Sequence, residues 1–113
     1  MKLFISALEN SLDAQVDQRF GRSVWLVGVD SDTGQWEAHE NPAAALSGGA
    51  GVAAAQFVID HGAGVVISGD FGPHAAQAFQ QAGVEMRLFT AEVSTVKDAV
   101  ALMVEKKLPL FKD

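Results

Sequence analysis

The fold of this chain is decided by the stretch Val65-Val66-Ile67-Ser68-Gly69-Asp70-Phe71-Gly72-Pro73. Its first three residues are β-branched and apolar, which is typical of a short strand buried on both faces. Gly72-Pro73 then predicts the start of a helix, because proline at the first helical position gives up no helical hydrogen bond. A helix that follows a buried strand so closely indicates a βαβ unit, whose strands run parallel.

The residues after this stretch complete the unit. Gly83 is placed to end the predicted helix. Apolar residues alternate from Val84 to Leu88 and predict the next strand. Thr95 and Asp98 have the spacing of a capping box, and the apolar residues that follow them recur at helical spacing. A third helix is therefore expected after the last strand.

The first half of the chain predicts three more strands and one more helix. Residues 3–5 are an apolar run typical of a buried strand. Residues 24–30 and 35–40 flank a turn that contains Gly34, which predicts an antiparallel hairpin. Residues 52–61 follow a helical apolar period. Together these elements predict an α/β fold with a mixed five-stranded sheet and three helices.

Length and composition limit the function classes. The chain has 113 residues, 49% of them hydrophobic, so we expect a single domain over residues 1–113. It carries 8 basic and 14 acidic residues, and a net charge of -6 without a basic stripe argues against a nucleic-acid partner. It has no cysteine, which excludes disulfides, Cys-ligated zinc and a thiolate-held cluster.

Nothing in the sequence predicts membrane insertion or export. The apolar runs are far shorter than the roughly 20 residues needed to cross a bilayer. Met1 to Ser6 enter a predicted strand directly, without the charged and apolar segments of a signal peptide. We therefore expect a cytoplasmic protein.

Two glycine-rich loops each precede a predicted helix: residues 47–51 and residues 69–72. Free amides and the helix dipole at such positions favour an anionic ligand. The alternative interpretation is that these glycines only permit tight turns, because neither loop matches a Walker A or dinucleotide motif. The pattern alone does not decide between the two.

Arg19 and Arg22 could hold a charged ligand from a third loop, just before the predicted hairpin. Alternatively they are solvated charges beside a turn, with Phe20 plugging the core. Of the three histidines, only His74 lies in the first turn of a helix next to a glycine loop. We expect structural roles for His39 and His61, since no two histidines have metal-site spacing.

Catalytic patterns are weak by comparison. The serines lie in no nucleophile-elbow motif, and the carboxylates are scattered. A two-metal nuclease would need clustered acidic residues, but residues 2–7 contain none. We therefore expect a protein that binds a ligand rather than an enzyme.

Four short motifs are informative when their order and spacing along the chain are considered together. They are Asp17 to Arg22, Asn41-Pro42-Ala43, Gly48 to Gly51, and Gly69 to Pro73. This combination resembles the dinitrogenase iron–molybdenum cofactor biosynthesis family, which includes NifX- and NafY-type cofactor carriers, the tail domain of NifB, and small stand-alone proteins. The resemblance covers nearly the whole chain.

The resemblance implies a ribonuclease-H-like fold without nuclease activity. It also implies binding or transfer of an iron–sulfur or iron–molybdenum cofactor precursor, with nitrogenase assembly proteins as partners. Such clusters are anionic and bring their own sulfides, so a carrier needs amides and arginines rather than cysteines. The residues carried over as the site wall are Phe20, Gly21, Arg22, Asn41, Gly48, Gly49, Gly51, Gly72 and Pro73, and geometry adds His74.

One departure from the family pattern concerns the candidate ligands. NifX-type members have His-Val-Asp-Gln-His-Phe-Gly where this chain has Gln15 and Arg19 at the two histidine places. This makes the chain similar to the stand-alone members, whose ligand the resemblance does not supply.

Two functional hypotheses follow. In the first, the glycine loops, Arg22 and His74 hold an anionic cluster that the protein carries to a partner. The alternative is a binding module without a cluster, for phosphate, a nucleotide or a protein partner. Both hypotheses predict that the two glycine loops and the Phe-Gly-Arg turn converge at one end of the sheet.

Overall fold

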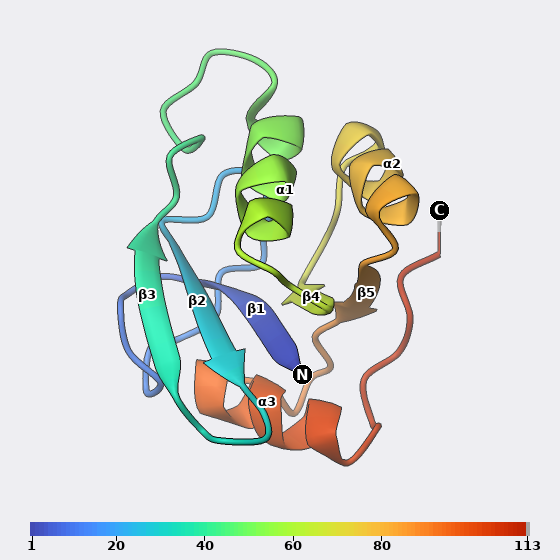
Figure 1. Ribbon diagram of the computed structural model, residues 1–113. Coiled ribbons are helices and arrows are strands. Elements are labelled where there is room, and N and C mark those ends of the chain that lie inside the picture. The colour runs from blue at the N-terminus through green and yellow to red at the C-terminus, as the bar shows by residue number, and fades with distance from the viewer. Residues whose placement is uncertain (113) are drawn as a thin grey trace.

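Five strands form one mixed sheet in a computed structural model that describes residues 1–112 (Figure 1). Their order across the sheet is β3-β2-β1-β4-β5. The strands are β1 (Lys2–Ala7), β2 (Trp25–Asp30), β3 (Trp36–Glu40), β4 (Val65–Ser68) and β5 (Glu85–Leu88). All five predicted strands are present, and each bound lies within one or two residues of its expected position.

Strand directions agree with the sequence prediction. β2 pairs antiparallel with both β1 and β3, whereas β4 pairs parallel with β1 and with β5. Gly34 adopts a φ of +78° in the β2–β3 connection, the left-handed conformation that glycine tolerates best. This arrangement confirms the mixed sheet and is consistent with the ribonuclease-H-like fold that the resemblance implies.

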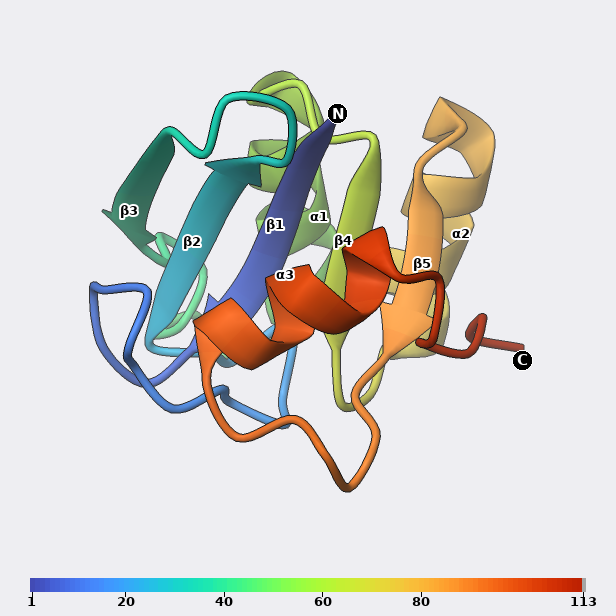
Figure 2. The ribbon, with the colours of Figure 1, turned by 90° about the horizontal axis from the view of Figure 1, so that it is seen from below.

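Helices cover the two faces of the sheet unequally. α1 (Ala50–Asp60) and α2 (Pro73–Ala82) lie side by side on one face, and α3 (Val96–Val104) crosses the other (Figures 1 and 2). Each face has its own core: Phe4, Phe20 and Phe79 are buried in the first, Ile5 and Val96 in the second. In the described part of the chain, no helix has the length and apolarity needed to cross a membrane.

The predicted start of the first helix was wrong by two residues. The apolar period suggested Val52, but α1 begins at Ala50. The reason is Gly49, which precedes the helix with a φ of +72° and turns the chain in one step. For α2 the prediction is confirmed, because Pro73 occupies the first turn and Gly83 ends the helix with a φ of +73°.

α3 differs from the other two helices at its N-terminus. Thr95 Oγ1 accepts a hydrogen bond from the Asp98 amide at 3.2 Å, and the Asp98 carboxylate accepts one from the Thr95 amide at 3.0 Å. Backbone donors from Thr95 and Ser94 lower the pKa of Asp98. The predicted capping box is therefore confirmed, whereas α1 and α2 begin without any side-chain cap.

Replacing Thr95 by alanine tests the capping box. Thr95→Ala leaves the amide of Asp98 without its acceptor and should lower the free energy of unfolding by about 1 kcal/mol. Urea denaturation followed by circular dichroism measures the change. Ser94→Ala is the matched control, since only the Ser94 main chain contributes to the box; an equal loss in both variants would contradict this assignment.

Candidate anion-binding site

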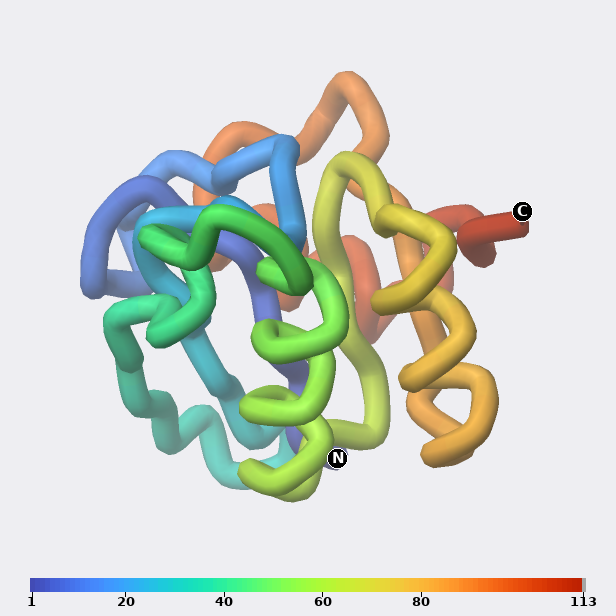
Figure 3. Tube along the Cα trace, turned by 90° about the horizontal axis from the view of Figure 1, so that it is seen from above, coloured from blue at the N-terminus to red at the C-terminus, as the bar shows by residue number. Residues whose placement is uncertain are grey.

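Three loops meet at the end of the sheet where β1, β3 and β4 finish. They are residues 17–24, residues 41–49 and residues 69–72, and they are seen end-on from above in Figure 3. Because β1, β3 and β4 all run in the same direction, their carboxyl ends share one edge of the sheet. Open α/β sheets characteristically bind ligands at this end.

Two adjoining hollows form a cleft between these loops. The first, of about 320 Å³, is lined by Arg19, Phe20, Gly21, Arg22, Ala50, Gly51, Asp70 and Gly72. The second, of about 460 Å³, is lined by Gly49, Ala50, Gly51, Val52, Gly72, Pro73, His74 and Ala75. Since Ala50, Gly51 and Gly72 belong to both, the cleft is continuous. The predicted convergence of the two glycine loops and the Phe-Gly-Arg turn is confirmed.

Asp17 organises the loop that carries the arginines. Its side chain is only 4% exposed, and its carboxylate accepts hydrogen bonds from the Arg19 amide at 3.0 Å and the Val24 amide at 3.3 Å. The Arg19 guanidinium donates two more, through Nε and Nη2, both at 3.2 Å. One buried carboxylate therefore closes residues 17–24 into a compact turn.

The same loop is anchored to the ends of β1 and β4. The Asp17 amide donates to the carbonyl of Ser6 at 2.9 Å, and the Ser6 hydroxyl lies 2.7 Å from the carbonyl of Asp17. Ser6 Oγ also lies 2.7 Å from Ser68 Oγ, and all three residues are buried. This polar network fixes the loop against the loop that follows β4.

Glycine is required where the loops touch. A Cβ atom on Gly21 would lie 2.9 Å from the Gly51 Cα and 3.0 Å from its nitrogen, so the two backbones are in direct contact. A Cβ atom on Gly69 would lie 2.7 Å from the carbonyl oxygen of Gln18. These contacts bring the start of α1 and the end of β4 against the arginine loop.

Arg22 and Asn41 both hydrogen-bond to main-chain carbonyls of the loops around the cleft. Arg22 Nη1 donates to the carbonyl of Ala44 at 3.1 Å and to that of Leu46. The buried Asn41 amide donates to the carbonyls of Gly21 at 3.1 Å and Ser23 at 3.0 Å. Arg22 still lines the first hollow, but Asn41 lines neither.

Phe20 forms the floor of the first hollow. It is 2% exposed and its ring packs 5.5 Å from Phe71 and 5.3 Å from Phe79, measured between centroids. This contact supports the core role that the sequence offered for Phe20 as an alternative. Phe20 therefore belongs to the core as well as to the lining of the cleft.

The remaining candidate residues divide into two groups. Gly49, Gly72, Pro73 and His74 line the second hollow, with His74 exposed in the first turn of α2. Gly48 is exposed, lines neither hollow, and a Cβ atom on it would meet nothing within 4 Å. The cleft therefore unites all the predicted site residues except Asn41 and Gly48.

Several groups that can attract an anion border the cleft, together with one carboxylate. α1 and α2 point their uncapped N-termini into it, and a helix N-terminus carries a partial positive charge. Arg19 is 63% exposed, and its hydrogen bonds to Asp17 raise the pKa of its guanidinium, which stays cationic. Asp70 contributes one opposing charge, and its carboxylate accepts from the Phe71 amide at 2.9 Å.

Metal-ligating side chains are not clustered in the part of the chain that the structure describes. Residues 1–112 contain no group of three or more histidine, cysteine or acidic side chains placed to hold a metal ion. The donors that the protein offers are amides, guanidinium groups and one imidazole.

Sequence reasoning missed part of the site. Arg19 was a weaker candidate than Arg22, yet Arg19 has the freer side chain at the cleft. Ala50 and Asp70 also line the cleft without having been predicted as site residues. The Asp17–Arg19 spacing of i, i+2 was visible, but it becomes informative only when Asp17 is known to be buried.

The fold and the cleft define a small α/β protein whose cleft, at the carboxyl end of its sheet, is bordered by two helix N-termini and two arginines. Residues 1–106 match the family described as dinitrogenase iron-molybdenum cofactor, and the chain belongs to that family. The family relates to biosynthesis of the nitrogenase iron–molybdenum cofactor. Among curated proteins, no relative matches the chain.

Solved structures include similar proteins from several organisms. The apo form of the orange protein from Desulfovibrio gigas is 37% identical, with a TM-score of 0.91 over 97% of this chain and 92% of that chain. A Thermotoga protein described as NifB and assigned to the DUF35 family is 24% identical, with a TM-score of 0.83 over 99% and 97%. A dinitrogenase-type protein from Methanocaldococcus jannaschii is 13% identical, with a TM-score of 0.71 over 100% and 96%. The last two support the fold alone.

A pair of glycine substitutions tests the backbone contact in the cleft. Gly21→Ala forces a methyl group against the Gly51 backbone and should cost about 1–3 kcal/mol of stability, as overpacking does. Gly48→Ala places the same methyl group in open space and should change stability by less than about 0.5 kcal/mol. Thermal unfolding compares them, and equal melting temperatures would contradict the contact.

Proposed function

We propose that this protein binds an anionic iron–sulfur precursor of the iron–molybdenum cofactor in the cleft and carries it to an assembly partner. The role is that of a carrier, not an enzyme. The observation that supports it most is the convergence of two uncapped helix N-termini with Arg19 and Arg22 in one hollow. Membership of the family supplies the class of cargo.

The donor set suits a cargo that brings its own ligands. The chain has no cysteine, so it cannot ligate the iron atoms of a cluster through thiolates. Backbone amides and guanidinium groups instead donate hydrogen bonds to an anion, and charge-assisted bonds of this kind are about twice as strong as neutral ones. Because these bonds are reversible, they suit a carrier that must release its cargo.

Gln15 and Arg19 stand where NifX-type members have histidine, and the two positions differ in their relation to the cleft. Gln15 lines neither hollow, and its main chain forms an isolated bridge with Thr95. Arg19 lines the first hollow and keeps a cation at its place. Exchange of histidine for arginine there trades a metal ligand for a hydrogen-bond donor, which favours recognition of the cluster's charge over direct ligation.

The orange protein provides a further point of support. Its structure is described as an apo form, a term used for a protein that lacks its ligand. At 37% identity over 97% of this chain, the neighbour makes a bound ligand a reasonable expectation here. The identity of this chain's ligand rests on the cleft and on the family.

Anaerobic titration with an extracted iron–sulfur cofactor precursor tests the proposal. Visible absorbance and protein-bound iron after gel filtration should show stoichiometric co-elution. Arg19→Gln should weaken binding by about 10- to 100-fold, the loss expected for charge-assisted hydrogen bonds. His74→Ala tests the imidazole in the same way.

Lys97→Gln is the matched control, because it removes one positive charge from an exposed residue on α3, across the sheet from the cleft. It should retain the wild-type affinity. If no iron is retained by the wild type, the carrier proposal fails. Phosphate-induced shifts of the Gly51 and Gly72 amide resonances would then favour the alternative, a module for a small anion.

A further inference from the structure

The sheet has two edges, and the chain protects only one of them. Beside β5, the Leu88 amide donates to the carbonyl of Pro109 at 2.9 Å, and the Phe111 amide donates to that of Met86 at 3.0 Å. The C-terminal segment therefore covers that edge. Beside β3, no other segment of residues 1–112 pairs with the strand.

The backbone of β3 presents alternate residues to this open edge. The Asp30 amide donates to the carbonyl of Gln35, and the Asn41 amide donates to that of Val24. In the register of the β2–β3 pair, Glu37 and His39 then occupy the positions that hydrogen-bond to β2. The amides and carbonyls of Trp36, Ala38 and Glu40 consequently point outward.

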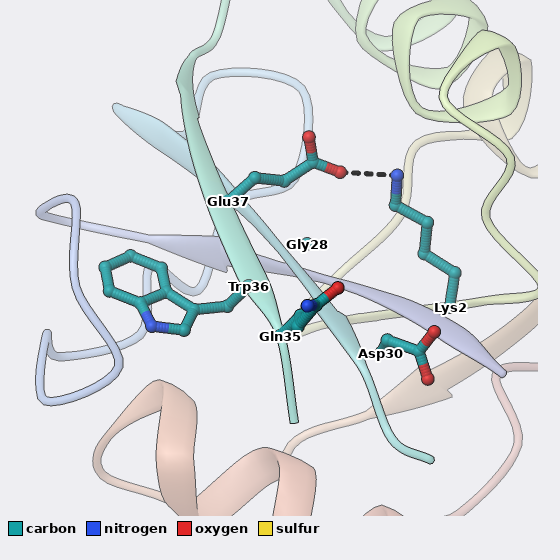
Figure 4. Close-up of a pocket in the computed structure, with 6 residues that line it drawn as sticks. All are labelled: Lys2, Gly28, Asp30, Gln35, Trp36 and Glu37. Carbon is teal, nitrogen blue, oxygen red and sulfur yellow. Dashed lines mark ion pairs between the residues drawn. The ribbon is translucent and has the colours of Figure 1, made fainter. Parts of the chain in front are cut away.

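Side chains of β3 also alternate between the two faces. Glu37 pairs with Lys2 on the face that carries α1 (Figure 4), and its carboxylate lies 3.0 Å from His39 Nε2. Trp36 points away from that pair, toward the face that carries α3, and it is 46% exposed. Exposed tryptophan is unusual on a free surface and is enriched at protein interfaces.

The strand has only part of the usual protection of an open edge, because it is short and carries two glutamates, Glu37 and Glu40. Proline, lysine and β-bulges commonly keep such an edge from pairing, but β3 contains neither residue and pairs with β2 in an unbroken register. Its sequence is Trp-Glu-Ala-His-Glu, with Ala38 at the centre. A small central residue leaves room for larger side chains from an approaching strand.

We infer that β3 pairs antiparallel with β3 of a second copy of this chain, about a two-fold axis at Ala38. Outward amides and carbonyls then meet in register: Ala38 lies opposite Ala38, and Trp36 lies opposite Glu40 of the other copy. On the other face, Glu37 lies opposite His39 twice. The two sheets join into one continuous sheet.

Charge and strand length together select this register over its neighbours. A shift by one pairing step in one direction places Glu37 opposite Glu37, and like charges directly opposite each other destabilise a sheet. A shift in the other direction leaves Trp36 and Glu37 without a partner in the other copy of β3. Only the register centred on Ala38 pairs all five residues and joins Glu37 with His39 at both places.

The proposed interface is small. Pairing along one five-residue strand covers far less than the roughly 1,600 Å² of a standard interface, and each copy carries a net charge of -6. We therefore expect reversible association with a dissociation constant on the order of 10–100 µM. The cleft lies away from the pairing edge, so this inference is independent of the proposed function.

Sedimentation equilibrium from about 10 µM to about 1 mM tests the inference, because that range brackets the expected constant. The apparent mass should rise toward twice the monomer mass of 11.9 kDa. His39→Glu should lose the dimer, because it puts two carboxylates opposite one another at both places, and Glu37→Lys should lose it because it removes the carboxylate that faces His39. Glu92→Lys makes the same charge change on an exposed loop residue and should dimerise as the wild type does.

An equimolar mixture of the Glu37→Lys and His39→Glu chains tests the register itself. In the mixed pair, a carboxylate again faces a lysine or histidine side chain at both cross-strand positions. A heterodimer should therefore form although each variant alone is monomeric. Melting temperatures confirm that both variants are folded. A wild type that stays monomeric at about 1 mM overturns the inference. Persistence of the dimer in Glu37→Lys, or failure of the mixture to associate, overturns the register.

Discussion

The buried carboxylate of Asp17 is the interaction on which the site depends. It accepts hydrogen bonds from the main chain of Arg19 and Val24 and from the Arg19 guanidinium. An unpaired carboxylate at 4% exposure would be costly, so the loop must fold around it in a way that satisfies it. That constraint places Arg19 at the cleft, and the link from Asp17 through Ser6 to Ser68 fixes the loop against β4.

The division between structural and ligand-facing groups follows from this constraint. Arg22 and Asn41 donate hydrogen bonds to neighbouring carbonyls, and Gly21 permits direct contact with Gly51. The groups left facing the cleft are the N-termini of two helices that have no side-chain cap. Because α3 has a complete capping box, the absence of caps on α1 and α2 is a specific feature of the helices at the cleft.

Local signals predicted the fold well. The apolar run 65–67, the Gly72-Pro73 junction and the Thr95–Asp98 spacing each depend on neighbours in sequence, and each was confirmed. Convergence of the loops was predictable because strands that run in one direction share their carboxyl ends. The roles of Asp17, Arg22 and Asn41 were not predictable, since their partners are set by burial and by contacts between separate loops. The α1 start was missed because Gly49, and not the apolar period, begins the helix.

Recognition of an anionic cluster by the amides of the cleft is the main proposal for this protein. The most direct measurement is a pair of ¹H–¹⁵N correlation spectra, recorded anaerobically with and without the iron–sulfur precursor. Shifts or paramagnetic broadening are expected at Arg19 to Arg22, Gly49 to Val52 and Gly72 to His74, with β3 and the end of α3 unchanged. Changes centred on β3 or α3 with an unperturbed cleft would contradict it.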